Sequence, residues 1–283
     1  MALKCGIVGL PNVGKSTLFN CLSKAKAQSA NFPFCTIEPN VGVITVPDER
    51  LEKLAALVKP EKVQATTIEI VDIAGLVKGA SKGEGLGNKF LANIRECNAI
   101  IHVLRCFDDN NIVRVDGSVN PLRDKETIDF ELQIKDLEAV EKKLDKYQKI
   151  AKSGDKEAIK IVGILDKYIT HLQKGESVRS INLTQKEKEV VADLYLLTDK
   201  PVLYVCNVDE VAAKDGNKYT EQLKQAIKTE DAEILLIATS IEAEIAELDD
   251  LEEQELFLNE LGLEKPGVLY LIQATYRLLN LQT

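Results

Sequence analysis

Short apolar runs alternate with amphipathic stretches along the first hundred residues of the chain. Strands are predicted where apolar residues follow one another, and helices where they recur every three or four positions. The strand candidates are 3–9, 40–46, 67–72 and 99–106, and the helix candidates are 15–25, 48–58 and 85–96. This alternation is typical of an α/β fold with a mainly parallel sheet that is covered by helices.

The pattern changes between residues 129 and 197, where no strand signal occurs. A break at 153–155 separates two series of apolar residues spaced mostly three, four or seven apart, which predict two antiparallel helices with a coiled-coil-like seam. The series are Phe130, Ile134, Leu137, Leu144, Tyr147 and Ala151, then Ile159, Val162, Leu165, Ile169 and Leu172. Strand signals return at 201–206 and 233–238. We therefore expect an inserted helical domain, 129–197, inside one α/β domain formed by 1–128 and 198–283.

Composition narrows the class of protein. The chain has 283 residues, 45% of them apolar, and a net charge of −9, which argues against general adhesion to nucleic acids or membranes. There is no run of about 20 apolar residues that could form a transmembrane helix, and no signal peptide is recognisable. The six cysteines show no C-x-x-C spacing and suggest reduced thiols. We expect a cytoplasmic, monomeric protein without a membrane partner.

Residues 9–17 match the phosphate-loop pattern G-x-x-x-x-G-K-S/T, directly after a predicted strand and at the start of a predicted helix. The backbone N–H groups of such a loop, together with the helix N-terminus, hold a polyphosphate. Lys15 is expected to reach the β- and γ-phosphates, and the Ser16 hydroxyl to hold Mg²⁺. The other expected nucleotide contacts are Asn12, Val13, Gly14 and Thr17. The predicted substrate class is a nucleoside triphosphate.

A threonine stands between the first predicted helix and the second predicted strand, within 31–37. GTPase-like proteins place a switch loop here, and its threonine coordinates Mg²⁺ and senses the γ-phosphate. Thr36 is predicted to have that role, with a threonine that merely caps a turn as the alternative.

The strand candidate 67–72 ends in the pattern D-x-x-G. Asp72 is predicted to bind Mg²⁺ through a water, and the Gly75 N–H to meet the γ-phosphate. The next residue is Leu76, where Ras-like enzymes have a glutamine that orients the attacking water. Leucine cannot do this, so the hydrolytic group comes from elsewhere or the intrinsic rate is low.

The segment 207–210 follows the strand candidate 201–206 at the place where guanine-specific proteins have Asn-Lys-x-Asp. Here Val208 replaces the lysine that packs over the base, and Glu210 is one methylene longer than the aspartate that binds guanine. An unpaired buried polar group costs about 1–3 kcal/mol, so ATP is favoured over GTP. Asn207 is expected to recognise the adenine amine, and Thr239 and Ser240 to line the base pocket.

These motifs together resemble the YchF family, the Obg-like ATPases. The resemblance rests on residues 9–17, 31–40 and 72–87, and it continues through Arg105 and the altered base motif to residues 278–283. It implies a GTPase-type P-loop fold with a helical insertion, ATP preference, and association with ribosomes or translation factors.

The chain departs from the family in two places. Members usually continue into a small TGS domain, whereas this sequence stops within an apolar helical pattern, and we expect that domain to be missing from it. The family also carries a histidine, thought to assist hydrolysis, where this chain has Arg114. An arginine cannot act as a base, but it can stabilise transition-state charge. An ordinary loop arginine is the alternative.

Two further ligand hypotheses remain open. Asn12 occupies the loop position that holds a monovalent cation in some related hydrolases, so K⁺ is a second candidate ion. The insertion is rich in lysine, with interleaved acidic residues. A solvated helix face is the ordinary interpretation of this pattern, and RNA contact is the alternative.

Three functional hypotheses survive. The first is a slow Mg²⁺-dependent ATPase switch that a ribosomal partner reads. The second is a GTPase of ordinary base specificity, against which Val208 and Glu210 speak. The third is a binding scaffold that holds nucleotide with negligible hydrolysis, which Leu76 makes plausible.

Overall fold

The computed structural model describes residues 3–29, 41–73, 86–109, 111–112, 118–230, 232–248, 250–279 and 281. These residues form two compact units. The first lies within 1–75, 97–124 and 202–283, and the second within 76–96 and 125–201. The sequence suggests an inserted domain with different bounds, 129–197, and those bounds remain a prediction.

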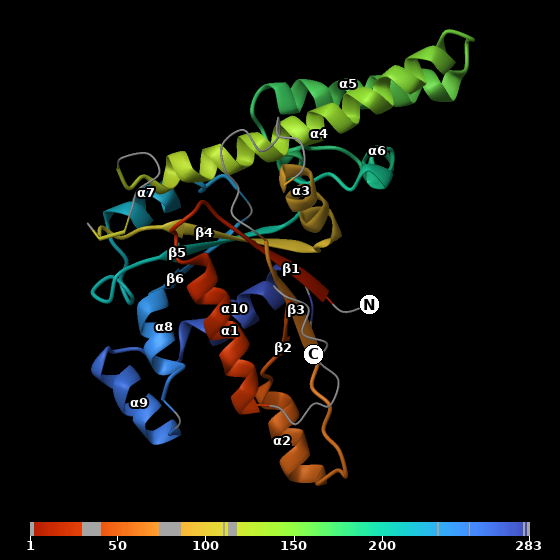
Figure 1. Cartoon of the computed structure of the whole chain (residues 1–283). Helices are drawn as coiled ribbons and strands as arrows, with labels where there is room; N and C mark the ends of the chain where they lie inside the picture. Colours follow the sequence, from red (N-terminus) through yellow and green to blue (C-terminus); the bar gives the residue numbers. More distant parts are fainter. Residues whose placement is uncertain are drawn as a thin grey trace. The chain divides into compact units, whose positions relative to one another are not determined.

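A six-stranded sheet forms the middle of the first unit (Figure 1). The strands are β1 (Leu3–Val8), β2 (Val41–Thr45), β3 (Thr67–Asp72), β4 (Ala99–Arg105), β5 (Val202–Asn207) and β6 (Glu233–Ile237). Their order is β2-β3-β1-β4-β5-β6. All neighbours pair in parallel except β2, which runs antiparallel to β3. Each predicted strand is confirmed, with limits that differ by no more than one residue at each end.

Burial explains which strands are central. Every residue of β4 and β5 is buried, as expected for parallel strands that are covered on both faces. The edge strand β2 instead alternates between buried and half-buried residues. Alternation reports which face is covered but not the strand direction, so the sequence could not indicate that β2 is antiparallel.

Six described helices belong to the first unit. They are α1 (Lys15–Ser29), α2 (Glu49–Val58), α7 (Lys218–Ala226), α8 (Thr239–Ile245), α9 (Leu251–Glu260) and α10 (Gly267–Leu278). Helix α1 contacts β2 and α8, and α10 contacts β4, β5 and β6. The apolar pattern near the end of the sequence is thus confirmed as a packed helix, in which Leu271 and Ile272 are buried. None of the described helices is both long and apolar enough to cross a membrane.

The described part of the second unit is helical. Its elements are α3 (Leu86–Glu96), most of α4 (Pro121–Ala151), α5 (Lys156–Gln173), η1 (Val178–Ser180), α6 (Gln185–Glu189) and η2 (Ala192–Leu194). Helices α4 and α5 form the predicted hairpin, and Gly154 turns the chain with a φ of 84°. Asp155 caps α5 by accepting hydrogen bonds from the N–H groups of Glu157 and Ala158.

The apolar seam of the hairpin is shorter than the sequence suggested. Leu165 and Leu172 are buried against Val140, as expected, but Phe130 is 59% exposed and Ile159 is 53% exposed. Helix α4 has 31 residues and α5 has 18. An antiparallel partner that is 13 residues shorter leaves the first turns of α4, which include Phe130, without α5 opposite them.

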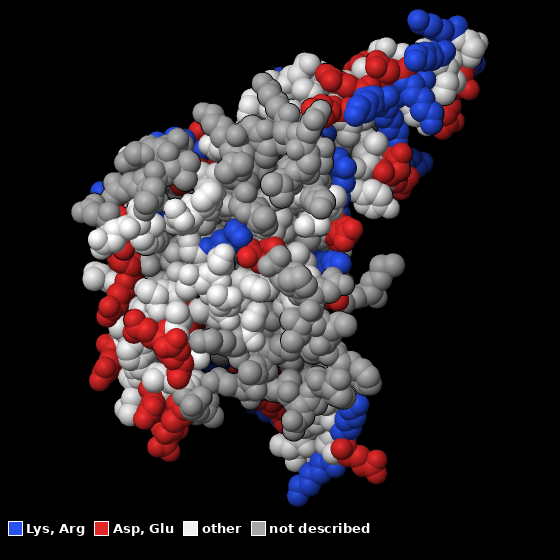
Figure 2. Space-filling view, viewed as in Figure 1, with Lys and Arg blue, Asp and Glu red and all other residues white. Residues whose placement is uncertain are grey.

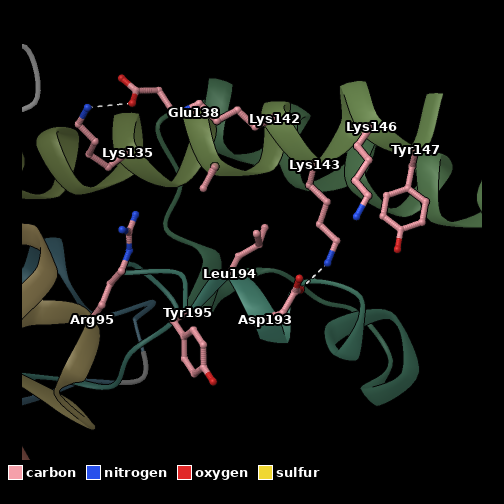
Figure 3. Close-up of a pocket in the computed structure, with 11 residues that line it drawn as sticks. Arg95, Lys135, Glu138, Lys142, Lys143, Lys146, Tyr147, Asp193, Leu194 and Tyr195 are labelled. Atoms are coloured by element: carbon pink, nitrogen blue, oxygen red, sulfur yellow. Dashed lines mark hydrogen bonds and ion pairs between the residues drawn. The ribbon is translucent and has the colours of Figure 1, made fainter. Parts of the chain in front are cut away.

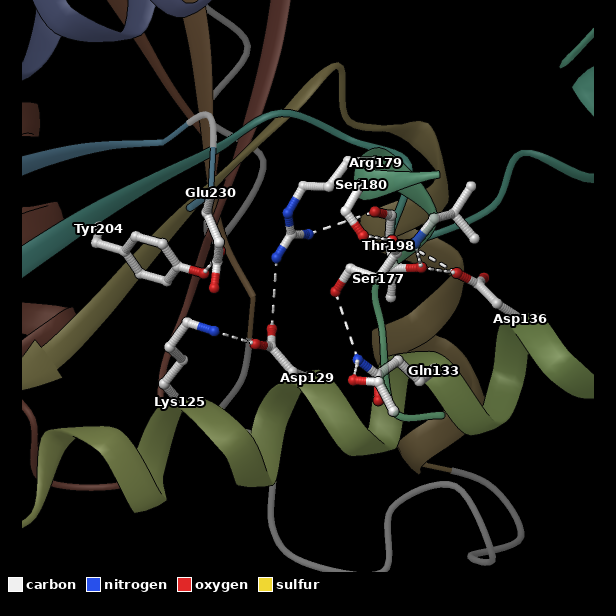
Figure 4. Close-up of polar contacts among 12 residues, drawn as sticks. Lys125, Asp129, Gln133, Asp136, Ser177, Arg179, Ser180, Thr198, Tyr204 and Glu230 are labelled. Carbon is white, nitrogen blue, oxygen red and sulfur yellow. Dashed lines mark hydrogen bonds and ion pairs between the residues drawn. The ribbon is translucent and has the colours of Figure 1, made fainter. Parts of the chain in front are cut away.

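Buried polar bonds fix the segment that follows the hairpin (Figure 4). The Asp136 carboxylate accepts hydrogen bonds from the backbone N–H groups of Leu197 and Thr198, at 2.7 and 2.8 Å, and from the Thr198 hydroxyl at 2.6 Å. Burial raises the pKa of Asp136 above its usual value, although these bonds oppose the shift. Gln133 adds a bond to the Gly175 carbonyl at 3.1 Å. The carboxylate thus attaches α4 to the chain that returns to β5.

Candidate functional site

The phosphate-loop segment follows β1 and leads directly into α1. Asn12 has a φ of 64° and Gly14 a φ of 93°, so two backbone positions of the loop are left-handed. Asparagine is among the few non-glycine residues that tolerate this conformation. A Cβ on Gly14 would lie 2.2 Å from Asn207 Nδ2 and 3.0 Å from Thr239 Oγ1. Glycine is therefore required at residue 14 by both the backbone angle and the close approach of its neighbours.

The start of α1 provides backbone donors for an anion. The first intrahelical bond here runs from the Leu18 N–H to the Gly14 carbonyl at 3.0 Å. The N–H groups of the first turn have no partner within a helix, and the helix dipole favours negative charge at this end. Ser16 and Thr17 are exposed there, so the Ser16 hydroxyl is accessible to a metal ion or a phosphate.

Lys15 and Asp72 form an ion pair in the site. The Lys15 ammonium donates to Asp72 Oδ1, and the two side chains are 9% and 13% exposed. The sheet register explains how they meet, because Ile7 at the end of β1 pairs with Asp72 at the end of β3. The two residues that the sequence assigned to the phosphates and to Mg²⁺ therefore lie together at the carboxyl edge of the sheet.

The donor set at this edge fits Mg²⁺ held jointly by protein and nucleotide. Mg²⁺ prefers oxygen ligands and is usually bound by one or two carboxylates together with substrate phosphates and waters. Ser16 and Asp72 offer a hydroxyl and a carboxylate. Within the described ranges, no group of three or more His, Cys, Asp or Glu residues could hold a metal by itself. The site therefore suits an ion that arrives with a polyphosphate.

The segment predicted to contact the base is tied to the phosphate loop by Asn207. Its Nδ2 donates to the Val13 carbonyl at 2.9 Å, and its Oδ1 accepts from the Thr239 N–H at 3.1 Å. The side chain is 2% exposed. Asn207 thus links the loop to the start of α8, a role that the sequence did not suggest. The amide has one further N–H and one further lone pair, so contact with adenine remains a prediction.

The other predicted base contacts differ in their access to solvent. Val208 is 2% exposed, and its N–H donates to the Ile237 carbonyl at 3.0 Å. Glu210 and Ser240 are exposed. No bond to the Glu210 carboxylate is present among the described residues. The structure therefore brings the predicted residues to one end of the sheet, and their contacts with a base remain predictions.

Arg105 organises the loop after β4 and was missed by the sequence analysis as a structural element of the site. Its guanidinium donates to three carbonyls, those of Phe107 at 3.2 Å, Asp109 at 3.0 Å and Ile112 at 3.4 Å. It also lies 4.7 Å from the centroid of the Phe107 ring. The sequence signal that could have revealed it is a charged residue at the end of a strand whose other residues are apolar except His102, and the structure shows this arginine 5% exposed.

Three predicted catalytic residues lie outside the described residues: Thr36, Gly75 and Arg114. Their roles at the γ-phosphate, at Mg²⁺ and in the transition state remain predictions.

Comparison with known proteins agrees with this fold. A family model described as 50S ribosome-binding GTPase matches residues 4–167. The whole chain is 52% identical to the ribosome-binding ATPase YchF of Escherichia coli O157:H7 over 283 residues, which are 77% of that protein. It is 51% identical to the protein of the same name from Bacillus subtilis, covering 78% of it. The solved structure of the Schizosaccharomyces pombe YchF GTPase matches with a TM-score of 0.86 and 36% identity, over 98% of this chain and 76% of that one.

Proposed function

The chain belongs to the YchF family of P-loop NTPases, and we propose that it is a Mg²⁺-dependent ATPase switch with slow turnover that works in association with the ribosome. The observation that carries the proposal is the group formed by Lys15, Asp72 and the exposed Ser16 at the start of α1. Such a group of a cation, a carboxylate and a hydroxyl beside a helix N-terminus is what a metal-bound triphosphate requires.

Nucleotide binding begins with an exchange of partners. Lys15 leaves Asp72 for the β- and γ-phosphates, and the released carboxylate becomes available to the metal. Each side chain would have an oppositely charged partner both before and after the exchange, which matters because both are largely buried. The two ligands would also be coupled, because a metal held by Asp72 would release Lys15 for the phosphates, and phosphates on Lys15 would release Asp72 for the metal.

Hydrolysis depends on positioning and charge. Ser16 and Asp72 would hold the Mg²⁺, which would supply positive charge against the phosphates. Lys15 and the backbone N–H groups of the loop stabilise the charge that develops on the transferred phosphoryl group. The chain has leucine rather than glutamine at residue 76, so no side chain there orients the attacking water, and turnover is slow. Thr36, Gly75 and Arg114 are proposed to sense or stabilise the γ-phosphate.

The proposed base is adenine. Glu210 stands where a guanine site needs an aspartate, and Val208, which replaces the lysine, is buried. The names of the relatives differ on this point, because the bacterial proteins are called ATPases and the yeast structure a GTPase. A GTPase of ordinary specificity therefore remains the second candidate, and its test is a direct comparison of the two nucleotides.

The proposed setting is the cytoplasm, where the ribosome is the partner. The relatives are named as ribosome-binding proteins, and the nucleotide state is proposed to control that binding. K⁺ near Asn12 is a further proposed ion. A scaffold that binds ribosomes without hydrolysis is the alternative to the switch.

The first experiment is calorimetry of nucleotide-free protein with ATP and with GTP, in the presence of Mg²⁺ and K⁺. We expect ATP to bind at least tenfold more tightly, which corresponds to about 1.4 kcal/mol. Equal affinities or a preference for GTP would contradict the ATPase assignment. Binding of neither nucleotide would contradict the whole proposal.

A second experiment separates the enzyme from the scaffold. Lys15→Ala is expected to reduce ATP hydrolysis by about a hundredfold or more, because it removes the cation at the transferred phosphoryl group. Lys53→Ala, at an exposed lysine of α2 in the same unit, is the matched control and is expected to change nothing. Undiminished, nucleotide-independent ribosome binding by Lys15→Ala would support the scaffold instead.

A further inference from the structure

The base segment, residues 207–217, runs from the end of β5 to the start of α7 and lies entirely within the first unit. It carries Val208 and Glu210, which are predicted to contact the base. The middle of the segment is a surface turn, in which Val211 is 94% exposed. An exposed turn presents its side chains to a ligand at a constant distance only where other groups hold it in place.

The backbone of Cys106, directly after β4, bonds to both ends of the base segment. Its N–H donates to the Asn207 carbonyl at 2.7 Å, and its carbonyl accepts from Asn217 Nδ2 at 2.6 Å. The first bond lies next to the sheet register that pairs Arg105 with Asn207. The second bond joins residues 111 positions apart in the sequence. Because Cys106 is 0% exposed, water does not compete for these two backbone groups.

Asn217 uses both ends of its side-chain amide. Its Oδ1 accepts from the N–H groups of Tyr219 and Thr220, at 3.0 and 3.2 Å, and so caps α7. Its Nδ2 is the group that reaches the Cys106 carbonyl. The residue before it, Gly216, has a φ of 79°, and a Cβ there would lie 2.4 Å from Thr220 Oγ1. The far end of the base segment is therefore tied to the helix cap and to the loop after β4 by one side chain.

The loop after β4 is itself held from two sides. The Arg105 guanidinium donates to the three loop carbonyls described above. From α7, the Tyr219 hydroxyl donates to Asp108 Oδ2 at 2.6 Å. A planar guanidinium fork holds several acceptors in a fixed arrangement, which a single ammonium cannot do. The loop thus offers the base segment a support that does not depend on the segment alone.

We propose that Asn217 and Arg105 are positioning residues for base recognition: Arg105 shapes the loop after β4, and Asn217 ties the base segment to the backbone of Cys106. The inference rests on the proposed function and adds to it what maintains the discrimination between ATP and GTP. The phosphate loop has its own determinants, the left-handed backbone of Asn12 and Gly14. Base recognition can therefore be weakened while phosphate binding persists.

Asn217→Asp tests the bond to Cys106 with little other change. Aspartate caps a helix as well as asparagine does, so α7 keeps its cap and the denaturant midpoint is expected to stay unchanged. The carboxylate has no N–H for the Cys106 carbonyl, and it places one acceptor against another. The variant therefore separates the tie between the base segment and the loop from the stability of the helix.

The measurement is calorimetry of the full chain with ATP, with GTP and with inorganic tripolyphosphate, which has no base, in the presence of Mg²⁺. For Asn217→Asp we expect ATP affinity to fall by at least about fivefold and the ratio of ATP to GTP affinity to approach one. Tripolyphosphate affinity is expected to stay within about twofold, since the phosphate loop is unchanged. At saturating ATP the turnover number is expected to stay the same, while KM rises.

Tripolyphosphate also has a second cationic surface to bind. A pocket of about 580 Å³ in the second unit is lined by five cationic side chains (Figure 3). They are Arg95, Lys135, Lys142, Lys143 and Lys146. Tripolyphosphate binding that remains in Lys15→Ala is therefore measured separately and subtracted from every titration.

Asn259→Asp is the matched control. It makes the same exchange at an exposed position of α9, in the same unit as Asn217. Figure 2 shows acidic side chains gathered over α9, so one more negative charge changes that surface little. All three affinities are expected to stay within about twofold of the wild type.

Arg105→Lys tests the other positioning residue. It keeps the positive charge but loses the fork, and one ammonium cannot hold three carbonyls. We expect ATP affinity to fall by about threefold or more and tripolyphosphate affinity to be retained. The same selectivity in Arg105→Lys and in Asn217→Asp would support a common action through the loop.

Four outcomes would overturn the inference. They are an equal loss of all three ligands by Asn217→Asp, an unchanged ATP affinity in that variant, the same selective loss in Asn259→Asp, and a wild-type chain that binds tripolyphosphate as tightly as ATP. Each of them leaves the proposed ATPase standing if the wild type hydrolyses ATP. A wild-type chain that binds neither ATP nor GTP would contradict the proposed function and this inference together.

Discussion

The phosphate end and the base end of the nucleotide site are built in different ways. At the phosphate end, the left-handed backbone of Asn12 and Gly14 and the first turn of α1 form the proposed binding surface. At the predicted base end, Asn207 has its amide bonded to the protein on both sides, and Glu210 is exposed and bonds to none of the residues that the structure describes. The comparison leads us to propose that phosphate binding depends on the backbone conformation of the loop, whereas the choice of base depends on a few side chains that can change without altering that conformation.

The largest expected effect on ATP affinity comes from disrupting the phosphate end at Gly14. Gly14→Ala strains a φ of 93° and drives a Cβ to 2.2 Å from Asn207 Nδ2. We expect ATP affinity to fall by about a hundredfold, roughly 2.8 kcal/mol, because the loop and Asn207 must both move. Calorimetry with ATP and Mg²⁺ measures it.

Gly154→Ala is the matched control, since Gly154 has a φ of 84° but no atom within 4 Å of the added Cβ. It shares the backbone strain without the steric clash, and it is expected to lower stability by about 1 kcal/mol and leave ATP affinity unchanged. Near-normal ATP binding by Gly14→Ala would show that the loop geometry is not what binds the phosphates.

The second prediction asks whether Asn207 reads the base or joins the two ends. Asn207→Ala leaves the Val13 carbonyl and the Thr239 N–H without their partner, at about 1–3 kcal/mol each. We expect the free energy of unfolding to fall by about 2–4 kcal/mol, and ATP and GTP affinities to fall by the same factor. Denaturant unfolding and calorimetry with both nucleotides measure these effects.

Asn98→Ala removes an exposed asparagine of the same unit that accepts one bond from the Lys4 N–H at 2.9 Å. It is expected to cost under 1 kcal/mol and to leave both affinities unchanged. A loss by Asn207→Ala that is confined to ATP would instead support the sequence-based assignment of Asn207 to the adenine amine.

How much could be predicted from the sequence differs in a similar way between local patterns and contacts of residues far apart in the chain. The strands, the hairpin and the meeting of Lys15 with Asp72 follow from apolar spacing and from motifs at the ends of neighbouring strands, which parallel pairing brings to one edge. The bond from Asn207 to Val13 joins residues 194 positions apart, and no local pattern encodes it. The exposure of Phe130 depends on where a partner helix ends, which spacing within α4 alone does not reveal.

A third prediction concerns the attachment of α8, the helix that begins at the base end. The Glu242 carboxylate is 4% exposed and accepts hydrogen bonds from the N–H groups of Gly267 at 2.6 Å and Val268 at 3.2 Å. Burial raises the pKa of Glu242 above 4.5, against the opposing effect of these bonds. The folded state therefore holds its proton to higher pH than the unfolded state does, and stability falls as pH rises from below 4.5 through the raised pKa.

Glu242→Gln removes this titration, so the stability of the wild type minus that of the variant is expected to fall as pH rises across that window. Apart from the titration, Glu242→Gln is expected to lower the free energy of unfolding by about 1 kcal/mol, because a glutamine amide has only one oxygen to accept the two hydrogen bonds. Denaturant unfolding from pH 4 to pH 8 measures the difference. Glu244→Gln, at an exposed glutamate of the same helix, is the matched control for exchanging a carboxylate for an amide. A difference that grows with pH would mean that the two N–H bonds outweigh burial.

The smallest expected effect is at Glu210, where the base end is most open to change. Its carboxylate is exposed and bonds to no described residue, so Glu210→Asp leaves the fold intact and shortens only the reach of the charge. We expect GTP affinity to rise by about three- to tenfold, because the shorter carboxylate is better placed for the guanine N1–H and amine, while ATP affinity stays within about twofold.

Glu210→Gln keeps the side-chain length but removes the charge, and it is expected to leave GTP affinity unchanged. Calorimetry with both nucleotides distinguishes the variants. Val208 is kept in all of them, because a lysine at that buried position would disturb folding. An unchanged GTP affinity in Glu210→Asp would mean that the backbone around Thr239 and Ser240 sets the base preference instead.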